Sequence, residues 1–363
     1  MNNLKKIGLT ALAGSLVAVS ANAGTMTVSG SLGATYSSQD GNTGTVATDS
    51  GQGFGSDKDF KVAGSGELDN GFTFSGYTLT KDDLTVSSSA LTLTMGSLGS
   101  VSVGHGFGGA STKYDVQTPT AYEEVDDSGA TSLSANFVGS WADNNSLVYA
   151  SPSYDVAGLG TVSFDAEYTP EASGTSPVDG GTVSSSLYGT GYSLGLTVES
   201  NGVKAGIYGS ERTNTQAKVD EAQDSFQGVY YVNYSYGPVS VGVSQSYYDA
   251  GLRVASELAT ATKVVGVAGG IFESTTMSIA YNINDNLSVS YAKATDEYDS
   301  QQDNTTAAAA TIEDTDMDFK TVTAAYSMGS MSIKALHTSI DNVGYDTNGG
   351  SLDTLEIALG LAF

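Results

Sequence analysis

The sequence predicts an all-β chain that closes into a transmembrane antiparallel β-barrel of about 16 strands, with short turns at one end and long loops at the other. Three observations predict this fold: the composition, long segments in which apolar and polar residues alternate, and links between them that are short and long in turn. Of the 363 residues, 45 are Gly, 21 are Tyr and only 5 are Pro. Such a composition favours strands over helices.

The charge and the lack of Cys exclude several classes of protein. The chain has 40 acidic and 14 basic side chains, a formal net charge of −26, so its surface repels phosphate and no nucleic-acid partner is expected. The absence of Cys excludes disulfide frameworks, thiol catalysis and zinc fingers. An apolar content of 39% is too high for a disordered acidic tail. The composition therefore indicates a folded, acidic β protein.

Residues 1–23 form a predicted signal peptide. A lysine pair precedes an apolar or small-residue run from Ile7 to Ser20, and Ala21-Asn22-Ala23 matches an A-x-A cleavage site. This run is too short for a spanning helix, and no other segment approaches about 18 consecutive apolar residues. We therefore expect an exported mature chain, 24–363, that meets a membrane only as a barrel.

Two segments show the alternation most clearly. Apolar residues at every second position from Met26 to Tyr36 alternate with Thr, Ser and Gly, and those from Leu355 to Phe363 alternate with small and polar residues. This period of two predicts strands with one apolar face. Strands of about 9 to 12 residues exceed the ~5–6 usual in soluble sandwiches and match the ~9–11 tilted residues that cross a bilayer.

The links between the segments alternate in length along the chain. Seven links read as tight turns: 69–71, 96–99, 156–160, 199–202, 236–238, 282–286 and 327–330. Eight links are longer and polar: 37–58, 81–88, 108–144, 170–183, 213–224, 249–269, 297–315 and 342–350. Together they join sixteen strands, and this arrangement is typical of outer-membrane barrels. A soluble sandwich would not alternate so regularly.

Three short motifs carry a resemblance to a known family. Gly99–His105 resembles the strand before the pore loop of the general porins of Gram-negative outer membranes, Asn145–Tyr154 resembles the strand after that loop, and Leu359–Phe363 resembles their C-terminal assembly signal. The resemblance implies a trimeric, non-enzymatic diffusion channel for small hydrophilic solutes and cations, surrounded by outer-membrane lipid and lipopolysaccharide. It also implies that the barrel-assembly machinery recognises the strand ending at Phe363. His105 stands where many of these porins have Arg.

The stretch 108–144 is far longer than an ordinary connection. The resemblance implies that it folds into the pore. The acidic residues then expected at the narrowest point are Asp115, Glu123, Glu124, Asp126 and Asp127. Clustered carboxylates attract cations and repel anions where the dielectric is reduced, so the channel is expected to prefer cations. The alternative is that the cluster is only a solvated loop surface.

Few basic residues are available to face this cluster. The basic residues expected on the opposing wall are Lys61, His105, Lys204, Arg212 and Lys334. Alternation places the three lysines on the polar faces of their strands, whereas Arg212 lies near a strand-to-loop junction. Basic residues across from acidic ones would set up a transverse field that orients dipolar solutes.

No motif indicates an enzyme. Only His105 and His337 are present, and no nucleophile motif accompanies them. Asp314–Asp318 is similar to the start of a calcium loop, but Phe319 and Ala325 stand where an EF-hand needs Gly and Glu. We therefore expect no cofactor beyond loosely bound divalent cations such as calcium.

A second function stays open: an exported, acidic, β-rich surface or adhesive structural protein. The apolar face of the strand ending at Phe363 favours the channel, because a surface protein has no reason to keep one whole face apolar. Small residues in the strands around 25–36 and 89–107 would allow close approach in lipid. With the resemblance, they predict a homotrimer that associates through the first few strands.

Overall fold

The computed structural model describes residues 24–41, 51–81, 84–115, 117–125, 127–128, 131–132, 144–172, 188–214, 223–249, 251, 271–299, 315–343 and 350–363. The predicted signal peptide at 1–23 lies outside these residues. Within the described part of the chain, no helix has the length and hydropathy needed to span a membrane.

Nearly all regular structure in these residues is β-strand. The strands are β1 (Met26–Gly41), β2 (Gly51–Glu67), β3 (Thr73–Lys81), β4 (Thr85–Thr94), β5 (Ser100–His105), β6 (Asp127–Ser128), β7 (Thr131–Ser132), β8 (Asn144–Ala150), β9 (Tyr154–Val156), β10 (Gly160–Thr169), β11 (Tyr188–Ser200), β12 (Val203–Asn214), β13 (Ser225–Tyr236), β14 (Val239–Asp249), β15 (Ile271–Asn284), β16 (Leu287–Asp299), β17 (Thr315–Met328), β18 (Met331–Asp341) and β19 (Leu352–Ala362). Two short 3-10 helices are η2 (Gly96–Leu98) and η3 (Ser111–Lys113).

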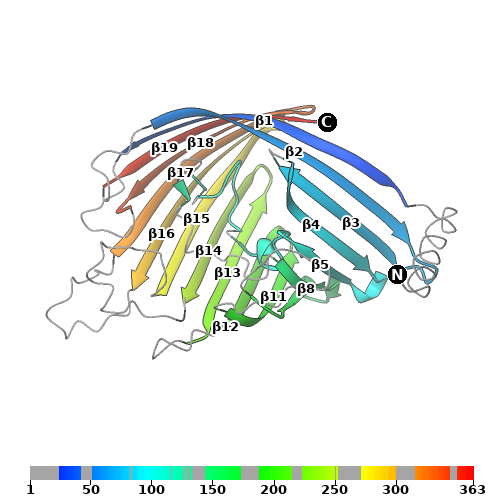
Figure 1. Ribbon diagram of the computed structural model, residues 1–363. Helices are drawn as coiled ribbons and strands as arrows, with labels where there is room; N and C mark the ends of the chain where they lie inside the picture. The colour runs from blue at the N-terminus through cyan, green and yellow to red at the C-terminus, as the bar shows by residue number, and fades with distance from the viewer. Residues whose placement is uncertain are drawn as a thin grey trace.

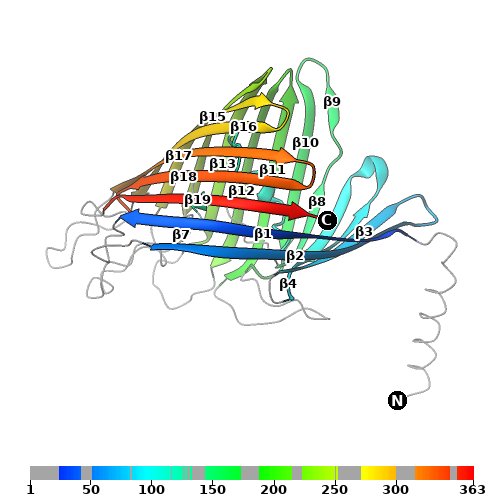
Figure 2. The same ribbon diagram turned by 90° about the horizontal axis from the view of Figure 1, so that it is seen from above.

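The strands form one closed antiparallel sheet, because β1 pairs with both β2 and β19. Figure 2 shows β1 lying between these two strands. β8 and β9 both pair with β10 and therefore form one interrupted strand. The 17 strands of the sheet thus occupy sixteen positions around the barrel. β6 and β7 pair only with each other. This is the sixteen-stranded barrel that the sequence predicts (Figure 1).

Tight turns join the strands at one end of the barrel, called the turn end, and mostly longer links join them at the other, the loop end. The predicted loop 81–88 is shorter than expected, because β3 ends at Lys81 and β4 already begins at Thr85. The β11–β12 hairpin turns at Asn201 and Gly202, whose φ angles of 49° and 83° are those of a type I′ turn. Gly71 turns the β2–β3 link with a φ of 82°. Each of the seven predicted turns lies at the link between two consecutive strands of the barrel.

The first predicted loop, 37–58, is wrong in its bounds. β1 continues to Gly41 and β2 begins at Gly51. The ladder runs on through the pair Tyr36 and Phe54, whose ring centroids lie 5.3 Å apart, and the Tyr36 hydroxyl donates a hydrogen bond to Gln52 at 2.8 Å. Backbone pairing and these cross-strand contacts override the low strand propensity of the Gly, Ser and Asp residues here.

Side chains alternate between an apolar outer face and a largely polar inner face. On β11, Tyr192 and Leu194 are 59% and 69% exposed, whereas Ser193 and Thr197 are 4% and 3% exposed. The covered face is the inner one, because it looks toward the rest of the closed barrel, whereas no protein lies beyond the outer face. An outer face of exposed apolar side chains is what contact with lipid requires.

At the loop end the inner face is apolar, which the alternation did not predict. Buried residues of β15–β19 and the link after β18 form a cluster with Val125, which belongs to the segment after β5. Its members on the barrel are Phe272, Ala292, Ala294, Tyr298, Met317, Phe319, Ile340, Val343 and Leu352. This part of the interior is a packed core, and it positions the segment that carries Val125.

Candidate functional site

Residues 106–115 and 117–125, here called the inner segment, lie against the inner face of the barrel. Gly106, Gly108 and Gly109 have φ angles of 56°, 79° and 61°, which let the chain turn away from β5. Hydrogen bonds then link the inner segment to β10, β13, β15, β16, β17 and β19. The segment therefore runs along the inner wall of the barrel from β10 to β19.

Two buried carboxylates on β10 hold the start of the inner segment. Asp165 accepts hydrogen bonds from Lys113 Nζ and from the Tyr114 hydroxyl, both at 2.6 Å. Glu167 accepts a hydrogen bond from the backbone N–H of Ala110 at 3.2 Å. Both carboxylates are 5% exposed. The cation and the donors compensate for the burial of negative charge.

The Tyr114 ring packs flat on the wall. It stacks on Tyr208 with a centroid distance of 5.1 Å and an interplanar angle of 20°. It also covers Gly195 of β11, where a Cβ would overlap the ring atoms. Burial and the hydrogen bond to Asp165 raise the pKa of Tyr114, so its hydroxyl remains protonated and keeps donating.

The middle of the inner segment crosses β13 to β16 through its backbone groups. The Asn233 amide donates to the carbonyl of Gln117, the Ser278 hydroxyl donates to that of Pro119 at 2.7 Å, and the N–H of Ala121 donates to the Ser290 hydroxyl at 3.1 Å. Polar wall side chains thus provide hydrogen-bond partners for the segment's partly buried backbone groups.

A third buried carboxylate, that of Glu356 on β19, holds the end of the inner segment. It accepts hydrogen bonds from the hydroxyls of Tyr122 at 2.7 Å and Ser37 at 3.2 Å. The Thr321 hydroxyl donates to the carbonyl of Val125 at 3.1 Å, and the Val125 side chain enters the apolar cluster. Burial, followed by the hydrogen bond to Glu356, raises the pKa of Tyr122. The segment is therefore fixed at both ends.

Three of the acidic residues predicted at the constriction belong to the inner segment. Asp115, Glu123 and Glu124 are all partly exposed. Asp126 lies outside the described residues, and Asp127 is described only through the backbone of β6, which lies beside β18 and β19. Glu123 and Glu124 therefore follow Tyr122 in the part of the segment that contacts β19.

Two of the predicted wall lysines contact the inner segment. Lys204 Nζ on β12 donates a hydrogen bond to Gln117 Oε1 at 3.4 Å. Lys334 Nζ on β18 lies 4.9 Å from the centroid of the Tyr122 ring. These cations lie beneath the segment rather than across an opening from it.

Lys61 and Arg212 lie against aromatic rings of the wall. Lys61 Nζ on β2 is 4.2 Å from the centroid of the Tyr77 ring. Arg212 Cζ, near the loop end of β12, is 3.4 Å from the centroid of the Tyr188 ring. Both are cation–π arrangements.

His105, also predicted on the basic wall, is the last residue of β5. In β5 it follows Val101 and Val103 at alternate positions, and it pairs with Ser89 in the same register that pairs Val103 with the exposed Leu91. The irregularity in this strand affects only its pairing with β8. The alternation of β5 gives His105 the phase of the outward valines, but the shift in pairing with β8 falls at this residue, so its place on the basic wall stays a prediction.

Sequence reasoning missed the carboxylates that hold the inner segment: Asp165, Glu167 and Glu356. A partial signal was present, because Asp165 and Glu167 alternate with outward Phe164 and Tyr168 on β10. That signal places them inside the barrel but does not say which part of the chain covers them.

Of the residues that resemble the start of a calcium loop, those at 315–318 lie in a strand. Asp316 and Asp318 belong to β17, and Asp318 forms an ion pair with Lys293 of β16 at 3.7 Å. Among the residues that the structure describes, no group of three or more His, Asp or Glu side chains could hold a metal ion.

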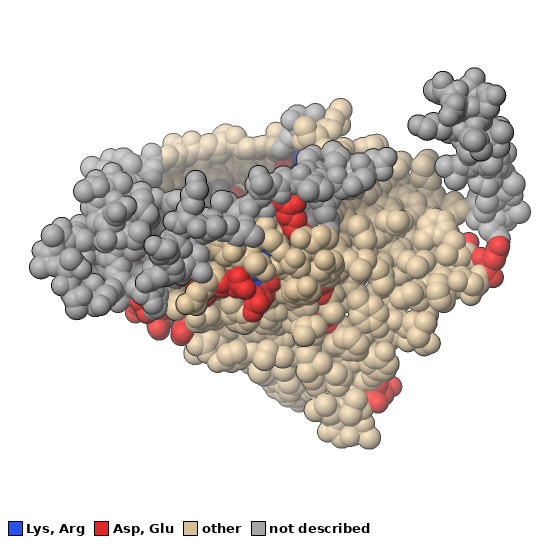
Figure 3. Space-filling view, turned by 60° about the horizontal axis from the view of Figure 1, so that its bottom comes forward, with Lys and Arg blue, Asp and Glu red and all other residues tan. Residues whose placement is uncertain are grey.

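Acidic side chains dominate the charge on the face shown in Figure 3. Red carboxylates are seen there at several places, and blue Lys and Arg atoms only as small spots. This agrees with the excess of acidic over basic residues in the whole chain, 40 against 14.

Comparison with known proteins agrees with this architecture. A family model described as Gram-negative porin matches residues 8–362. No curated protein matches the chain in sequence.

Several solved structures are similar in fold at low sequence identity. They include OmpF of Salmonella typhi (TM-score 0.64, 13% identity, 94% of this chain and 98% of that chain), OmpT of Vibrio cholerae (0.60, 14%, 94% and 98%) and the anion-selective porin from Comamonas acidovorans (0.60, 13%, 94% and 100%). At these identities the likeness shows the fold, and the family model, which matches nearly the whole sequence, shows the family. The chain therefore belongs to the Gram-negative porin family.

Proposed function

We propose that this chain is a diffusion channel of the outer membrane that passes ions and small hydrophilic solutes passively and prefers cations. Its family and its closed barrel support a channel. The observation that carries the preference is the inner segment, which holds Glu123 and Glu124 and is fixed across the interior between β10 and β19. The channel performs no chemistry of its own.

A segment that crosses the interior reduces the width left for solutes. Where the passage is narrow, protein replaces water around a passing ion, and each carboxylate acts on that ion through a lower effective dielectric. Glu123 and Glu124 are partly exposed at this place, and Asp126 and Asp127 follow directly in the sequence. Four acidic positions in five residues therefore support a preference for cations.

The fold by itself does not set the selectivity. The porin from Comamonas acidovorans, which is described as anion-selective, has a similar fold with a TM-score of 0.60. The charges that line the passage must therefore decide which ions pass. The net charge of −26 of this chain favours cations.

Membership of the family also supports a location and a set of partners, and argues against the alternative of a surface or adhesive protein. We propose that the signal peptide is removed after Ala23, that the turn end faces the periplasm, and that lipid and lipopolysaccharide surround the outer face. Barrel-assembly machinery would recognise the strand ending at Phe363. Three copies would associate through the first few strands, and any divalent cations such as calcium would be loosely bound.

The test removes charge from the inner segment and keeps its shape. We expect a channel carrying E123Q, E124Q, D126N and D127N to lose most of its preference for K⁺ over Cl⁻, so its reversal potential in a KCl gradient moves toward zero. In the parent, the preference should shrink as salt rises, because the Debye length falls from ~30 Å at 0.01 M to ~3 Å at 1 M. It should also fall as the pH drops through about 4, where ordinary carboxylates titrate.

The matched control removes the same four charges from the outer face. Glu211, Glu273, Asp316 and Asp353 are exposed and alternate with inward residues on their strands. Their amide variants should leave the reversal potential close to that of the parent. If the two quadruple variants have equal selectivity, the segment's carboxylates do not line the passage and the cation preference has another origin.

A further inference from the structure

A pocket of about 230 Å³ opens on the wall formed by β1, β2 and β3, toward the turn end. Its polar lining consists of Thr25, Thr27, Lys61, Ser65, Ser75 and Tyr77. The hydrogen bonds of the inner segment run to β10 through β19, so this pocket lies on a separate stretch of the wall. A solute that passes the inner segment on its open side would meet this wall.

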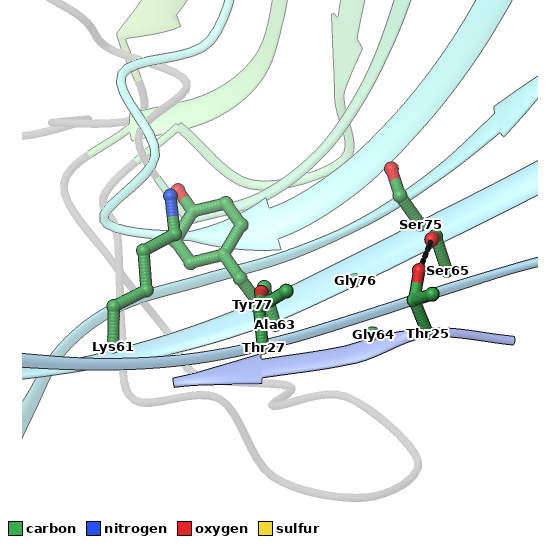
Figure 4. A pocket seen from close by; sticks show the side chains of 9 residues that line it. All are labelled: Thr25, Thr27, Lys61, Ala63, Gly64, Ser65, Ser75, Gly76 and Tyr77. Carbon is green, nitrogen blue, oxygen red and sulfur yellow. Dashed lines mark hydrogen bonds between the residues drawn. The ribbon is translucent and has the colours of Figure 1, made fainter. Parts of the chain in front are cut away.

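The register of the sheet places these side chains on the inner face. Ala63 pairs with Tyr77 and Ser65 pairs with Ser75, and paired residues share a face. Lys61 alternates with Phe60, whose side chain is exposed on the outer face. Figure 4 shows the Lys61 and Tyr77 side chains pointing to the same side of the sheet, with Ser65 and Ser75 farther along the strands.

Lys61 supplies a positive charge that forms no ion pair with another residue in the described part of the chain. Its Nζ lies 4.2 Å from the Tyr77 centroid, so the ring covers one side of the ammonium group. An ammonium group has three N–H donors, and a ring occupies only part of them. Within the described residues, the lysines in ion pairs are Lys113, Lys293 and Lys320. Lys61 therefore has donors to offer to an anion.

Hydroxyl groups complete the pocket. The hydroxyls of Thr25 and Ser65 lie 3.1 Å apart and bond to each other, and Ser75 stands opposite Ser65 on the next strand. A hydroxyl both donates and accepts, so this cluster matches the alcohol groups of a small polyol. The pocket thus combines one cation, several hydroxyls and the aromatic ring of Tyr77.

We propose that this pocket binds small organic anions that carry hydroxyl groups, such as hydroxycarboxylates and sugar acids. The carboxylate contacts Lys61, and the alcohol groups contact Thr25, Ser65 and Ser75. The volume of about 230 Å³ is below the ~300–1,000 Å³ of pockets for drug-sized ligands and suits a solute the size of one sugar unit. The proposal rests on the proposed channel function, through which such solutes would reach the pocket.

The test measures how gluconate interacts with the channel in a planar bilayer, with acetate as a probe that has the charge but no hydroxyls. The matched control for Lys61→Gln is Lys58→Gln, which removes the same charge from the exposed outer face of the same strand, where Lys58 pairs with Leu32. We expect gluconate to interrupt the current of the parent and of K58Q at the same concentration. K61Q should need a gluconate concentration at least about tenfold higher for the same effect, which is the loss of affinity expected when a charge-assisted contact is removed.

A second variant separates binding from general electrostatics. The double substitution S65A and S75A keeps every charge, so it should weaken the effect of gluconate and leave that of acetate unchanged. Equal gluconate responses in K61Q and K58Q, or acetate acting as strongly as gluconate on the parent, would overturn the proposal.

Calorimetric titration of gluconate into the detergent-solubilised barrel makes the pocket testable apart from conduction. Heat of binding in the parent that K61Q loses supports the pocket even if the protein does not conduct, an outcome that overturns only the channel function. Conduction without gluconate binding overturns the pocket alone.

Discussion

Gly195 shows how one missing side chain positions the inner segment. It lies under the Tyr114 ring, where a Cβ would overlap ring atoms. We expect Gly195→Ala to push the ring off the wall and to weaken the hydrogen bond from Tyr114 to Asp165, a contact to a charged group worth ~1.5–3 kcal/mol. Single-channel recording should show a larger or less steady conductance, and the barrel should unfold at a lower temperature.

The control for this variant is Gly53→Ala on β2. A Cβ added at Gly53 would meet nothing within 4 Å, so the substitution should change neither conductance nor melting. Identical recordings from the two alanine variants would show that the Tyr114 ring does not depend on Gly195.

At the level of single residues, the sequence predicts which face of a strand a side chain lies on better than it predicts which residue that side chain contacts. The inward phase of Lys204 follows from its neighbours Val203 and Ala205 in an alternating strand. Its contact with Gln117, however, joins residues 87 positions apart, and the bond from Tyr122 to Glu356 spans 234 positions. Such contacts depend on the path of the inner segment through the closed barrel, which no local pattern encodes.

At the level of elements, Val125 fixes the end of the inner segment. Val125 is buried in the apolar cluster of β15 to β19. We expect Val125→Asp to release this end, because burying an unpaired charge among apolar side chains is strongly unfavourable, by several kcal/mol. Limited proteolysis of the detergent-solubilised barrel should then cut within residues 117–132, and the open-channel conductance should rise.

Val125→Ile is the matched variant, since it keeps the side chain apolar and close in size. It should resist protease as the parent does. A V125D channel with the protease resistance and conductance of the parent would show that the contacts of Tyr122 and Pro119 hold the segment without Val125.

At the level of elements, the turns were predictable and the ends of the strands were not. Asn201-Gly202 identifies a tight turn locally, because both residues readily adopt positive φ. The extension of β1 and β2 was not visible, since residues 37–41 and 51–58 are rich in Gly, Ser and Asp, which are usual in loops. The apolar cluster also escaped prediction. At the loop end of these strands the usual alternation is reversed: polar residues such as Lys320 and Asp353 face outward and apolar residues face inward.

For the molecule as a whole, Phe363 lies at the seam where the sheet closes. Its backbone exchanges two hydrogen bonds of 3.0 Å with Gly30 of β1, and its ring covers Gly30, where a Cβ would approach the ring to 2.7 Å. We expect Phe363→Asp to leave most of the protein unassembled. A lipid-facing charge is unfavourable by ~2–4 kcal/mol at the midplane and less near the edge, so the larger part of the effect should come from lost assembly recognition.

The measurement is the fraction of heat-modifiable barrel in outer-membrane extracts. Phe54→Asp provides the comparison, because Phe54 is an exposed aromatic residue of β2 that takes no part in the seam. This variant should assemble in much larger amounts than F363D. Normal assembly of F363D would mean that Phe363 is not read as a signal.

The pairing of β1 with β19 also fixes the order of events during biosynthesis. A ribosome delivers β1 first and its second neighbour last, so one edge of β1 has no partner until translation is nearly finished. Strand edges left unpaired in this way invite aggregation, and contacts between the two ends of a chain form slowly. The chain can therefore become a closed barrel only after the last strand has been made, and until then one edge of β1 stays open to pairing with other copies.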